Sequence, residues 1–171
     1  MSNLVYLMCS LPSLSFGQSP PISMEEFTSD AKSQLNRKSF AKLEAIDIQN
    51  MSLNSTKAEL KKFSAMFTGL KEDISEIRHA KTQRRSPRIS ALPKTILAKN
   101  PFEREMDILK WQWEELDSIE AGKTFTLTEV LVYKLKLQIL TRLDSFNTEK
   151  GSKILASVVN PAKKKEEQWQ E

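Results

Sequence analysis

Apolar residues recur along the chain at the spacing of three and four residues that is typical of amphipathic helices. The clearest stripe in the first half comprises Leu60, Phe63, Phe67, Leu70, Ile74 and Ile77. A stripe in the second half comprises Phe102, Met106, Leu109, Trp113 and Leu116. Because each stripe is narrow, as in coiled coils, each predicted helix is expected to bury one face against a neighbour.

The segment 126–146 differs because it carries two apolar seams. One seam comprises Val130, Tyr133, Leu137 and Leu140. The other comprises Val132, Leu135, Ile139, Leu143 and Phe146. A helix with two apolar faces needs neighbours on two sides, so we expect this helix to lie at the centre of the bundle.

Capping signals predict where several other helices begin and end. Ser23 and Glu26 match a capping box, so a helix should begin near Met24. A break near Asn36 should separate it from a second short helix. Asn100 and Pro101 suit the start of a helix, which Gly122 should end.

These signals predict an all-α fold, an elongated bundle of about five to six helices with a short apolar N-terminal segment. The helical domain would span 1–160, with an N-terminal half (1–85), a linker (86–100) broken by Pro87 and Pro93, and a C-terminal bundle (101–160). A polar turn over 50–56 should cap the long helix that follows it. A shorter helix with Ile154, Leu155 and Val158 should follow Gly151, and residues 161–171 should form a disordered tail.

The opening segment is apolar but does not match an export signal. No Lys or Arg precedes Leu4, and the residues before Cys9 are larger than those before a lipoprotein acceptor cysteine. We expect residues 4–16 to form an extended or short helical element of the core, with Cys9 as a small buried hydrophobe. An exported lipoprotein acylated at Cys9 is the disfavoured alternative.

Composition argues against catalysis and metal chemistry. Hydrophobic residues make up 39% and charged residues 28% of the chain, which is typical of a globular protein. The chain has one Cys and one His, His79. This composition excludes an internal disulfide framework and argues against a metal site or a catalytic triad. No glycine-rich phosphate loop or nucleophile elbow is present. We therefore expect no enzymatic activity, no cofactor and no metal.

A basic run follows the long helix of the first half, in a chain of net charge +4. It comprises Arg78, Lys81, Arg84, Arg85 and Arg88. These cations could bind phosphate backbones, anionic lipid or an acidic protein face. Alternatively, they favour the helix dipole and solubilise a linker. No aromatic residue lies between His79 and Leu97 to stack on bases, which argues against single-stranded RNA as the ligand.

Trp111 is a further candidate contact residue. It lies two positions before Trp113 and therefore off the apolar stripe. It either covers a second contact surface or packs against another internal helix.

Three stretches resemble a bacterial family of uncharacterised proteins encoded within V/A-type ATP synthase operons. They are VYLMCSLPSLSFGQSPPISMEEF (5–27), NPFEREMDILKWQWEELD (100–117) and FTLTEVLVYKLKLQILTRL (125–143). The family occupies the place of the helical central-stalk protein that joins the rotor shaft to the membrane ring, and it resembles a reduced relative of that protein. The resemblance implies an all-α, non-catalytic protein that acts as a helical spacer or coupling element between the shaft and the ring.

The leading hypothesis is therefore a non-catalytic subunit or assembly-associated protein of such an ATP synthase. It would be cytoplasmic or peripheral at the inner face of the cell membrane. It would contact stalk or ring subunits through the basic run or Trp111. The alternative is a basic helical nucleic-acid-binding protein that uses residues 78–88. Co-purification with rotary ATPase subunits would favour the first hypothesis, and a salt-dependent shift with nucleic acid would favour the second.

Overall fold

The protein is an all-α bundle in a computed structural model that describes residues 3–48 and 58–146. Within these ranges it has no strand and forms α1 (Leu4–Ser10), α2 (Met24–Gln34), α3 (Arg37–Ala45), α4 (Ala58–Thr82), the 3₁₀ helix η1 (Lys94–Ala98), α5 (Pro101–Glu120) and α6 (Leu127–Asp144). The predicted helical bundle is thus confirmed. The turn over 50–56, the helix with Ile154 and the tail 161–171 lie outside the described residues.

The predicted helix starts are observed with their capping bonds. The Ser23 hydroxyl accepts from the Glu26 backbone N–H at 3.1 Å, and the Glu26 carboxylate accepts from the Ser23 N–H at 2.9 Å. Asn36 caps α3, and Asn100 caps α5 with Pro101 in the first helical position. Local sequence therefore decides where these helices begin.

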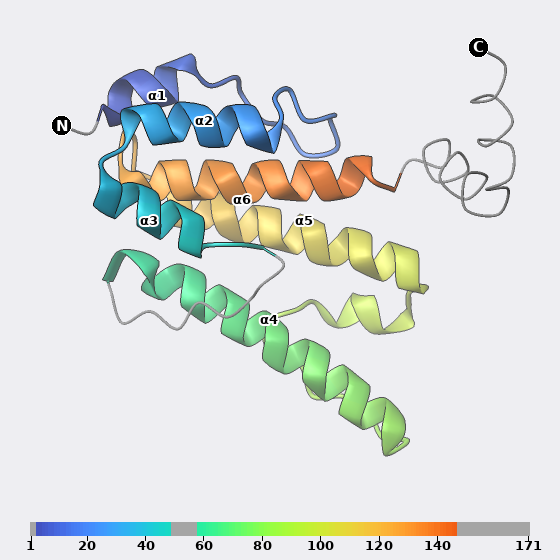
Figure 1. Cartoon of the computed structure of the whole chain (residues 1–171). Helices are drawn as coiled ribbons and strands as arrows, with labels where there is room; N and C mark the ends of the chain where they lie inside the picture. Colours follow the sequence, from blue (N-terminus) through green and yellow to red (C-terminus); the bar gives the residue numbers. More distant parts are fainter. Residues whose placement is uncertain (1–2, 49–57, 147–171) are drawn as a thin grey trace, which may run out of the picture.

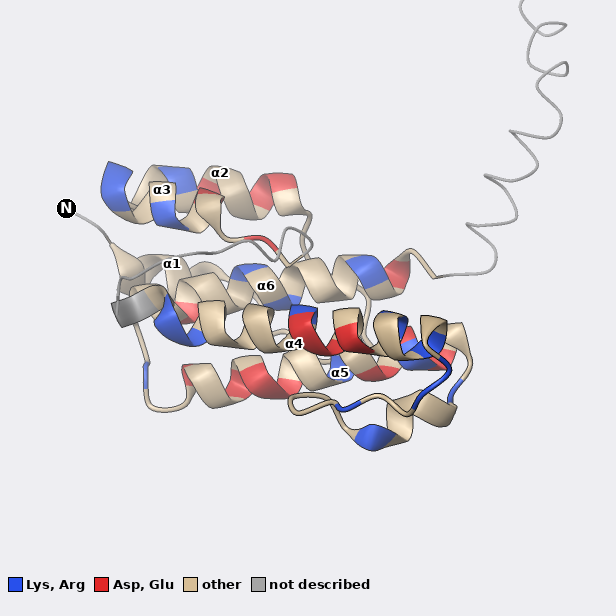
Figure 2. Cartoon of the chain, turned by 90° about the horizontal axis from the view of Figure 1, so that it is seen from below, with Lys and Arg blue, Asp and Glu red and all other residues tan. Residues whose placement is uncertain are grey.

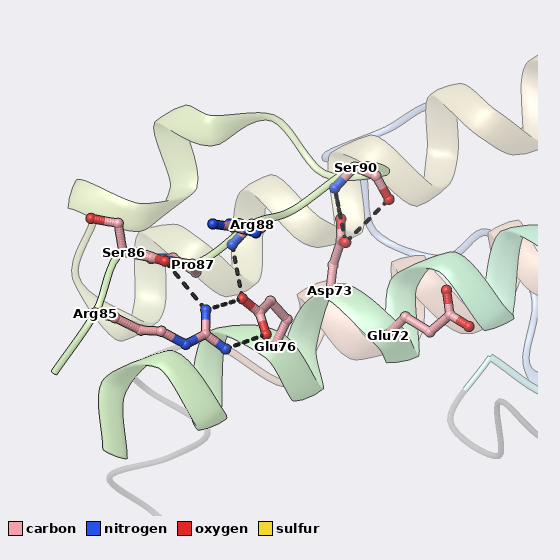
Figure 3. A pocket seen from close by; sticks show the side chains of 8 residues that line it. All are labelled: Glu72, Asp73, Glu76, Arg85, Ser86, Pro87, Arg88 and Ser90. Carbon is pink, nitrogen blue, oxygen red and sulfur yellow. Dashed lines mark hydrogen bonds and ion pairs between the residues drawn. The ribbon is translucent and has the colours of Figure 1, made fainter. Parts of the chain in front are cut away.

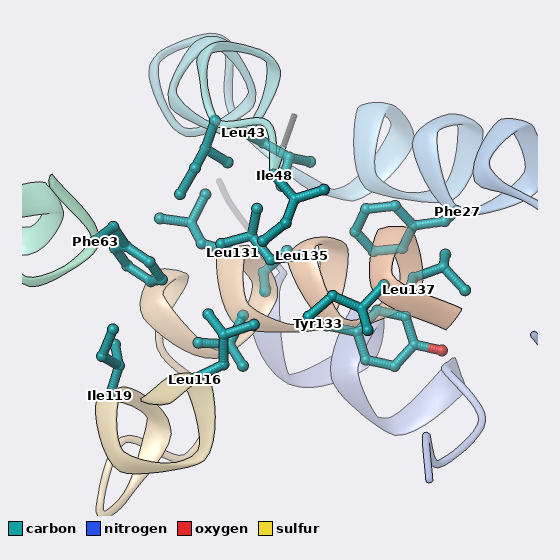
Figure 4. Packing of buried hydrophobic residues seen from close by; sticks show 14 of the residues in the cluster. Phe27, Leu43, Ile48, Phe63, Leu116, Ile119, Leu131, Tyr133, Leu135 and Leu137 are labelled. Carbon is teal, nitrogen blue, oxygen red and sulfur yellow. The ribbon is translucent and has the colours of Figure 1, made fainter. Parts of the chain in front are cut away.

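Helix α6 lies at the centre of the bundle, as its two seams predict. It packs against α5 along its length and also contacts α1, α2 and α3 (Figure 1). Its buried apolar residues are Val130, Leu131, Val132, Tyr133, Leu135, Leu137, Ile139 and Leu140. Side chains from α2, α3, α4 and α5 converge on them from several sides (Figure 4).

Two polar side chains of α6 donate hydrogen bonds to backbone carbonyls of neighbouring segments. The half-buried Lys134 ammonium donates to the carbonyls of Leu43 and Ile46, each at 2.7 Å, and so satisfies the C-terminal end of α3. Burial lowers the pKa of Lys134, against the opposing effect of the nearby Asp47 and Glu44 carboxylates. On another face, the Tyr133 hydroxyl donates to the carbonyl of Pro12 at 2.9 Å, and burial raises the pKa of Tyr133 to about 12.

Residues 86–100, which the sequence suggested as a linker, pack against α4 and α5. Leu92 and Ile96 are buried with Leu70 of α4 in a second, smaller apolar cluster. Ile74, Ile77, Ile89, Leu97, Ile108 and Trp111 border this cluster. The segment thus covers the C-terminal half of α4, which extends away from the main core (Figure 1).

The N-terminal segment is helical but lies on the surface of the bundle. Leu7 is fully buried, whereas Val5 is 53% exposed. Cys9 is exposed, so its predicted burial is wrong. A single short helix that lies over α2 and α6 can bury only one row of side chains, and that row passes through Leu7 rather than Cys9.

Candidate functional site: the basic tip of α4

The C-terminal end of α4 and the loop that follows it concentrate positive charge. Residues 77–102 contain seven Lys or Arg residues and no Asp or Glu. We call residues 78–94 the basic tip. Figure 2 shows these cations along the end of α4 and the returning loop. Positive side chains therefore predominate in this segment.

A left-handed residue turns the chain back at the end of α4. Arg84 has φ 52°, and the Arg85 N–H donates to the carbonyl of Ala80 at 3.0 Å. This bond spans six residues, as in a Schellman motif, where glycine usually occupies the left-handed position. The turn directs residues 85–92 back along the helix from which they emerged.

Glu76 holds the first part of the returning loop. Its carboxylate accepts from the Arg85 guanidinium at 2.5 and 2.8 Å, and from the Arg88 backbone N–H at 3.0 Å. The hydrogen bonds from the Arg85 side chain and the Arg88 backbone hold the pKa of Glu76 at about 2. The Arg85 guanidinium also donates to the Gln83 amide oxygen at 2.7 Å. The hydrogen bonds of the Arg85 side chain are therefore made within the tip.

Asp73 holds the second part of the loop. It is only 3% exposed, and its carboxylate accepts from the backbone N–H groups of Ser90, Ala91 and Leu92 at 2.8 to 3.1 Å. Asp73 and Glu76 lie three residues apart and therefore on the same face of α4 (Figure 3). Together the two carboxylates fasten the loop to the helix.

This arrangement divides the predicted binding residues into two groups. Arg78, Lys81 and Arg84 are exposed, and no ion pair is seen for them among the described residues. Arg88 is exposed and uses its backbone N–H within the tip. Arg85, by contrast, pairs with Glu76 and is less available to a partner.

A shallow cavity of about 850 Å³ lies between α4 and the returning loop. Its lining includes Glu72, Asp73 and Glu76 from the helix and Arg85, Pro87 and Ser90 from the loop (Figure 3). Two of these carboxylates are occupied by the loop. No cluster of three or more possible metal ligands occurs among the residues that the structure describes.

Trp111 serves internal packing. It is partly buried and contacts both apolar clusters, so it joins the main core to the cluster under the basic tip. Of the two possibilities that the sequence left open, the structure therefore favours packing against internal helices.

Asp73 and Glu76 shape the site but were not among the predicted site residues. Both looked like solvated acids on an amphipathic helix. The available signal was their spacing of three residues, directly before a basic loop interrupted by prolines. Carboxylates placed in this way can accept from the loop's backbone N–H groups.

The fold and the site place the protein among all-α bundles. Its distinguishing feature is a basic tip that two carboxylates fasten to α4. A family model described as "Protein of unknown function (DUF2764)" matches residues 90–166, which include η1, α5 and α6. No curated protein and no solved structure matches the chain. In the described ranges, no helix has both the length and the apolar character needed to cross a membrane.

Proposed function

We propose that this protein is a non-catalytic subunit or assembly-associated protein of a bacterial V/A-type ATP synthase. It acts as a helical spacer or coupling element between the rotor shaft and the membrane ring, at the cytoplasmic face. Its basic tip docks on an acidic face of a stalk or ring subunit.

The observation that carries this proposal is the way the tip is presented. α4 has 25 residues and is about 37 Å long, so it holds the tip at a distance from the α6 core. The carboxylates of Asp73 and Glu76 fix the loop, while Arg78, Lys81 and Arg84 point their charges to solvent. A preorganised cationic surface on a stiff support suits protein docking, because little side-chain and loop entropy is lost on binding.

The sequence resemblance adds a second line of support. Two of the three stretches that resemble the ATP synthase operon family, 100–117 and 125–143, form α5 and α6. Both lie within the region matched by the family model of unknown function. These two helices form the principal helix pair of the bundle, as expected for a mechanical element.

The proposal is tested by reversing the free cations of the tip. The triple variant Arg78→Glu, Lys81→Glu and Arg84→Glu leaves the Glu76–Arg85 pair in place. Each exposed ion pair is worth about 0–1 kcal/mol, so three reversals should weaken association with the purified ATP synthase roughly tenfold at low salt. The loss should shrink as salt rises, and the melting temperature should change little.

A matched control is available on the opposite side of the bundle. The variant Lys32→Glu, Arg37→Glu and Lys38→Glu has the same change in net charge at three exposed positions of α2 and α3. It should bind like the parent protein. Equal binding by the tip variant and the parent would contradict the proposal. Nucleic-acid binding by the parent that is lost in the tip variant and falls steeply with salt would favour the alternative function.

A further inference from the structure

The end of the bundle opposite the basic tip brings three large apolar side chains to the surface. Val5 and Tyr6, in the first turn of α1, are 53% and 59% exposed, and Phe125, in the α5–α6 connection, is 43% exposed. Cys9 is also exposed and lies four residues after Val5, on the same face of α1. Figures 1 and 2 both show the start of α1 and the α5–α6 connection at this end.

Phe125 has a backbone conformation that few large residues adopt. Its φ is 57°, in the left-handed region, and its N–H donates to the Glu129 carboxylate at the start of α6. A left-handed conformation at a bulky residue costs free energy, and such residues cluster at functional sites. The exposed ring of Phe125 is therefore a candidate contact group.

The start of α1 is fixed beside a segment that carries only positive charge. Residues 1–24 contain no Lys, Arg, Asp or Glu, whereas residues 31–43 contain four Lys or Arg residues and no acid. The Asn3 N–H donates to the Gln34 carbonyl at 3.0 Å. This bond holds the uncharged start of α1 against the corner between α2 and α3.

Three exposed cations lie at this corner. Lys32 is in the last turn of α2, and Arg37 and Lys38 are in the first turn of α3. Arg37 follows Gln34 by three residues, so their Cα atoms are at most about 11 Å apart. No ion pair is seen for the three cations within the described ranges. The exposed residues of this surface, which we call the α1 end, are Val5, Tyr6, Cys9, Lys32, Arg37, Lys38 and Phe125.

The combination of these side chains suits a lipid surface better than a protein. Three large apolar side chains are too few for the centre of a stable protein interface, which buries about 800 Å² on each partner. At a bilayer, aromatic and apolar side chains enter the interfacial region, while Lys and Arg contact anionic headgroups. Each Lys or Arg held near an anionic bilayer raises the partition coefficient about fivefold.

We propose that the α1 end binds the surface of an anionic lipid bilayer. Val5, Tyr6 and Phe125 enter the interfacial region, and the three cations contact the headgroups. The basic tip then lies away from the bilayer, because α4 carries it to the other end of the molecule (Figure 1). The inference concerns a surface separate from the tip and does not depend on the proposed function. An acidic protein is the competing partner.

Binding of the full-length protein to vesicles of equal parts phosphatidylcholine and phosphatidylglycerol tests the charged contact. Lys32→Glu, Arg37→Glu and Lys38→Glu together should lower the partition coefficient at least about tenfold. The triple variant of the basic tip has the same change in net charge. It should lower the partition coefficient less than about threefold, because the tip lies farther from the bilayer than the screening length. Vesicles of phosphatidylcholine alone should bind the parent protein weakly.

The apolar contact is tested with uncharged variants. Val5→Ser, Tyr6→Ser and Phe125→Asn together should lower the partition coefficient about tenfold, and Asn is chosen because it tolerates the left-handed backbone. Phe102→Ser removes an equally exposed ring at the start of α5 and should bind like the parent. A polarity-sensitive fluorophore on Cys9, the only cysteine, should shift its emission to the blue on anionic vesicles.

Four results would overturn the proposal. They are no binding of the parent to anionic vesicles, an unshifted fluorophore on bound vesicles, equal losses in Phe102→Ser and the apolar triple variant, and a loss confined to the tip variant. The last result would assign the lipid contact to the basic tip. If the parent ignored vesicles but the variant at Lys32, Arg37 and Lys38 lost association with the ATP synthase, the partner would be an acidic protein. Failure of vesicle binding with intact docking of the tip would leave the proposed function standing.

Discussion

Glu76 is the residue whose carboxylate fastens residues 85–88 of the basic tip to α4. Its carboxylate accepts two hydrogen bonds from the Arg85 side chain and one from the Arg88 backbone. The ionised carboxylate therefore holds the Arg85 side chain and the Arg88 backbone at the same time. Such a carboxylate resists protonation, because the proton would displace donors that the folded chain already supplies.

The Glu76 carboxyl should titrate with a midpoint of about 2, below its ordinary value of 4.5. A lowered pKa means that the stabilising contribution is fully present above about pH 4.5 and is lost as the pH falls through 2. Carboxyl chemical shifts followed by NMR against pH would measure the midpoint. Residues 85–88 should stay packed on α4 as long as the pH remains above this midpoint.

The variant Arg85→Gln separates the two causes of the lowered pKa. It removes the larger contribution and leaves the Arg88 N–H in place, so the Glu76 midpoint should rise but stay below 4.5. A midpoint near 4.5 in the parent protein would contradict the ion-pair geometry.

At the residue scale, the sequence showed which side chains are charged but not which of them form ion pairs. The run from Arg78 to Arg88 was evident, yet the sequence could not show that Arg85 pairs with Glu76 or that Arg78 has no ion pair among the described residues. This distinction depends on the turn at Arg84, where a non-glycine residue adopts a left-handed conformation. Cys9 shows the same limit, since an apolar neighbourhood in sequence did not show which row of a short helix faces inward.

Among the described residues, α6 contributes more buried side chains than any other helix, because apolar side chains surround it on several sides. Leu137 and Ile139 are both fully buried, and they belong to different seams. Removal of either side chain would leave a cavity that neither neighbouring helix can fill without moving.

Leu137→Ala and Ile139→Ala should therefore each lower the free energy of unfolding by about 2–5 kcal/mol. Urea denaturation would measure the change. Thr141→Ala, at an exposed position of the same helix, is a suitable control and should lie within about 0.5 kcal/mol of the parent. If either core variant melted like the parent, the central place of α6 in the bundle would be wrong.

At the element scale, the sequence predicted most of the fold. Periodicity located α4, α5 and α6, and side-chain caps located the starts of α2, α3 and α5. The packed state of residues 86–98 was not predicted, because two prolines and several cations are typical of a linker. Its order comes from long-range groups, the Asp73 carboxylate and the apolar surface around Leu70.

The whole molecule contains two apolar clusters of unequal size. The larger surrounds α6, and the smaller lies between α4 and residues 89–97. Trp111 packs on both. A small cluster closed by a few hydrogen bonds is expected to open at a lower free energy than the main core.

Asp73→Asn should open the smaller cluster selectively. The asparagine amide would place a donor where the carboxylate accepted the Ala91 and Leu92 N–H groups, leaving donors facing donors. Amide exchange in residues 90–98 should become faster, while exchange in residues 131–140 stays unchanged. Glu72→Gln, an exposed acid one position away, is the control.

Uniform acceleration across both clusters in Asp73→Asn would show that the molecule opens as one unit. No acceleration in either cluster would show that the carboxylate does not fasten the loop. The described geometry predicts neither result.

The close approach of the returning loop also couples the choice of side chain at two distant positions. A Cβ atom at Gly69 would lie 3.2 Å from the Cβ of Ala91, tighter than an ordinary contact. Glycine inside a helix costs roughly 0.5–1 kcal/mol relative to alanine, and close packing with the loop offsets this cost. During sequence divergence, enlargement of residue 69 would thus require a smaller residue 91 or a shifted loop. Positions 69 and 91 should consequently covary in size among chains that keep a tip of this shape.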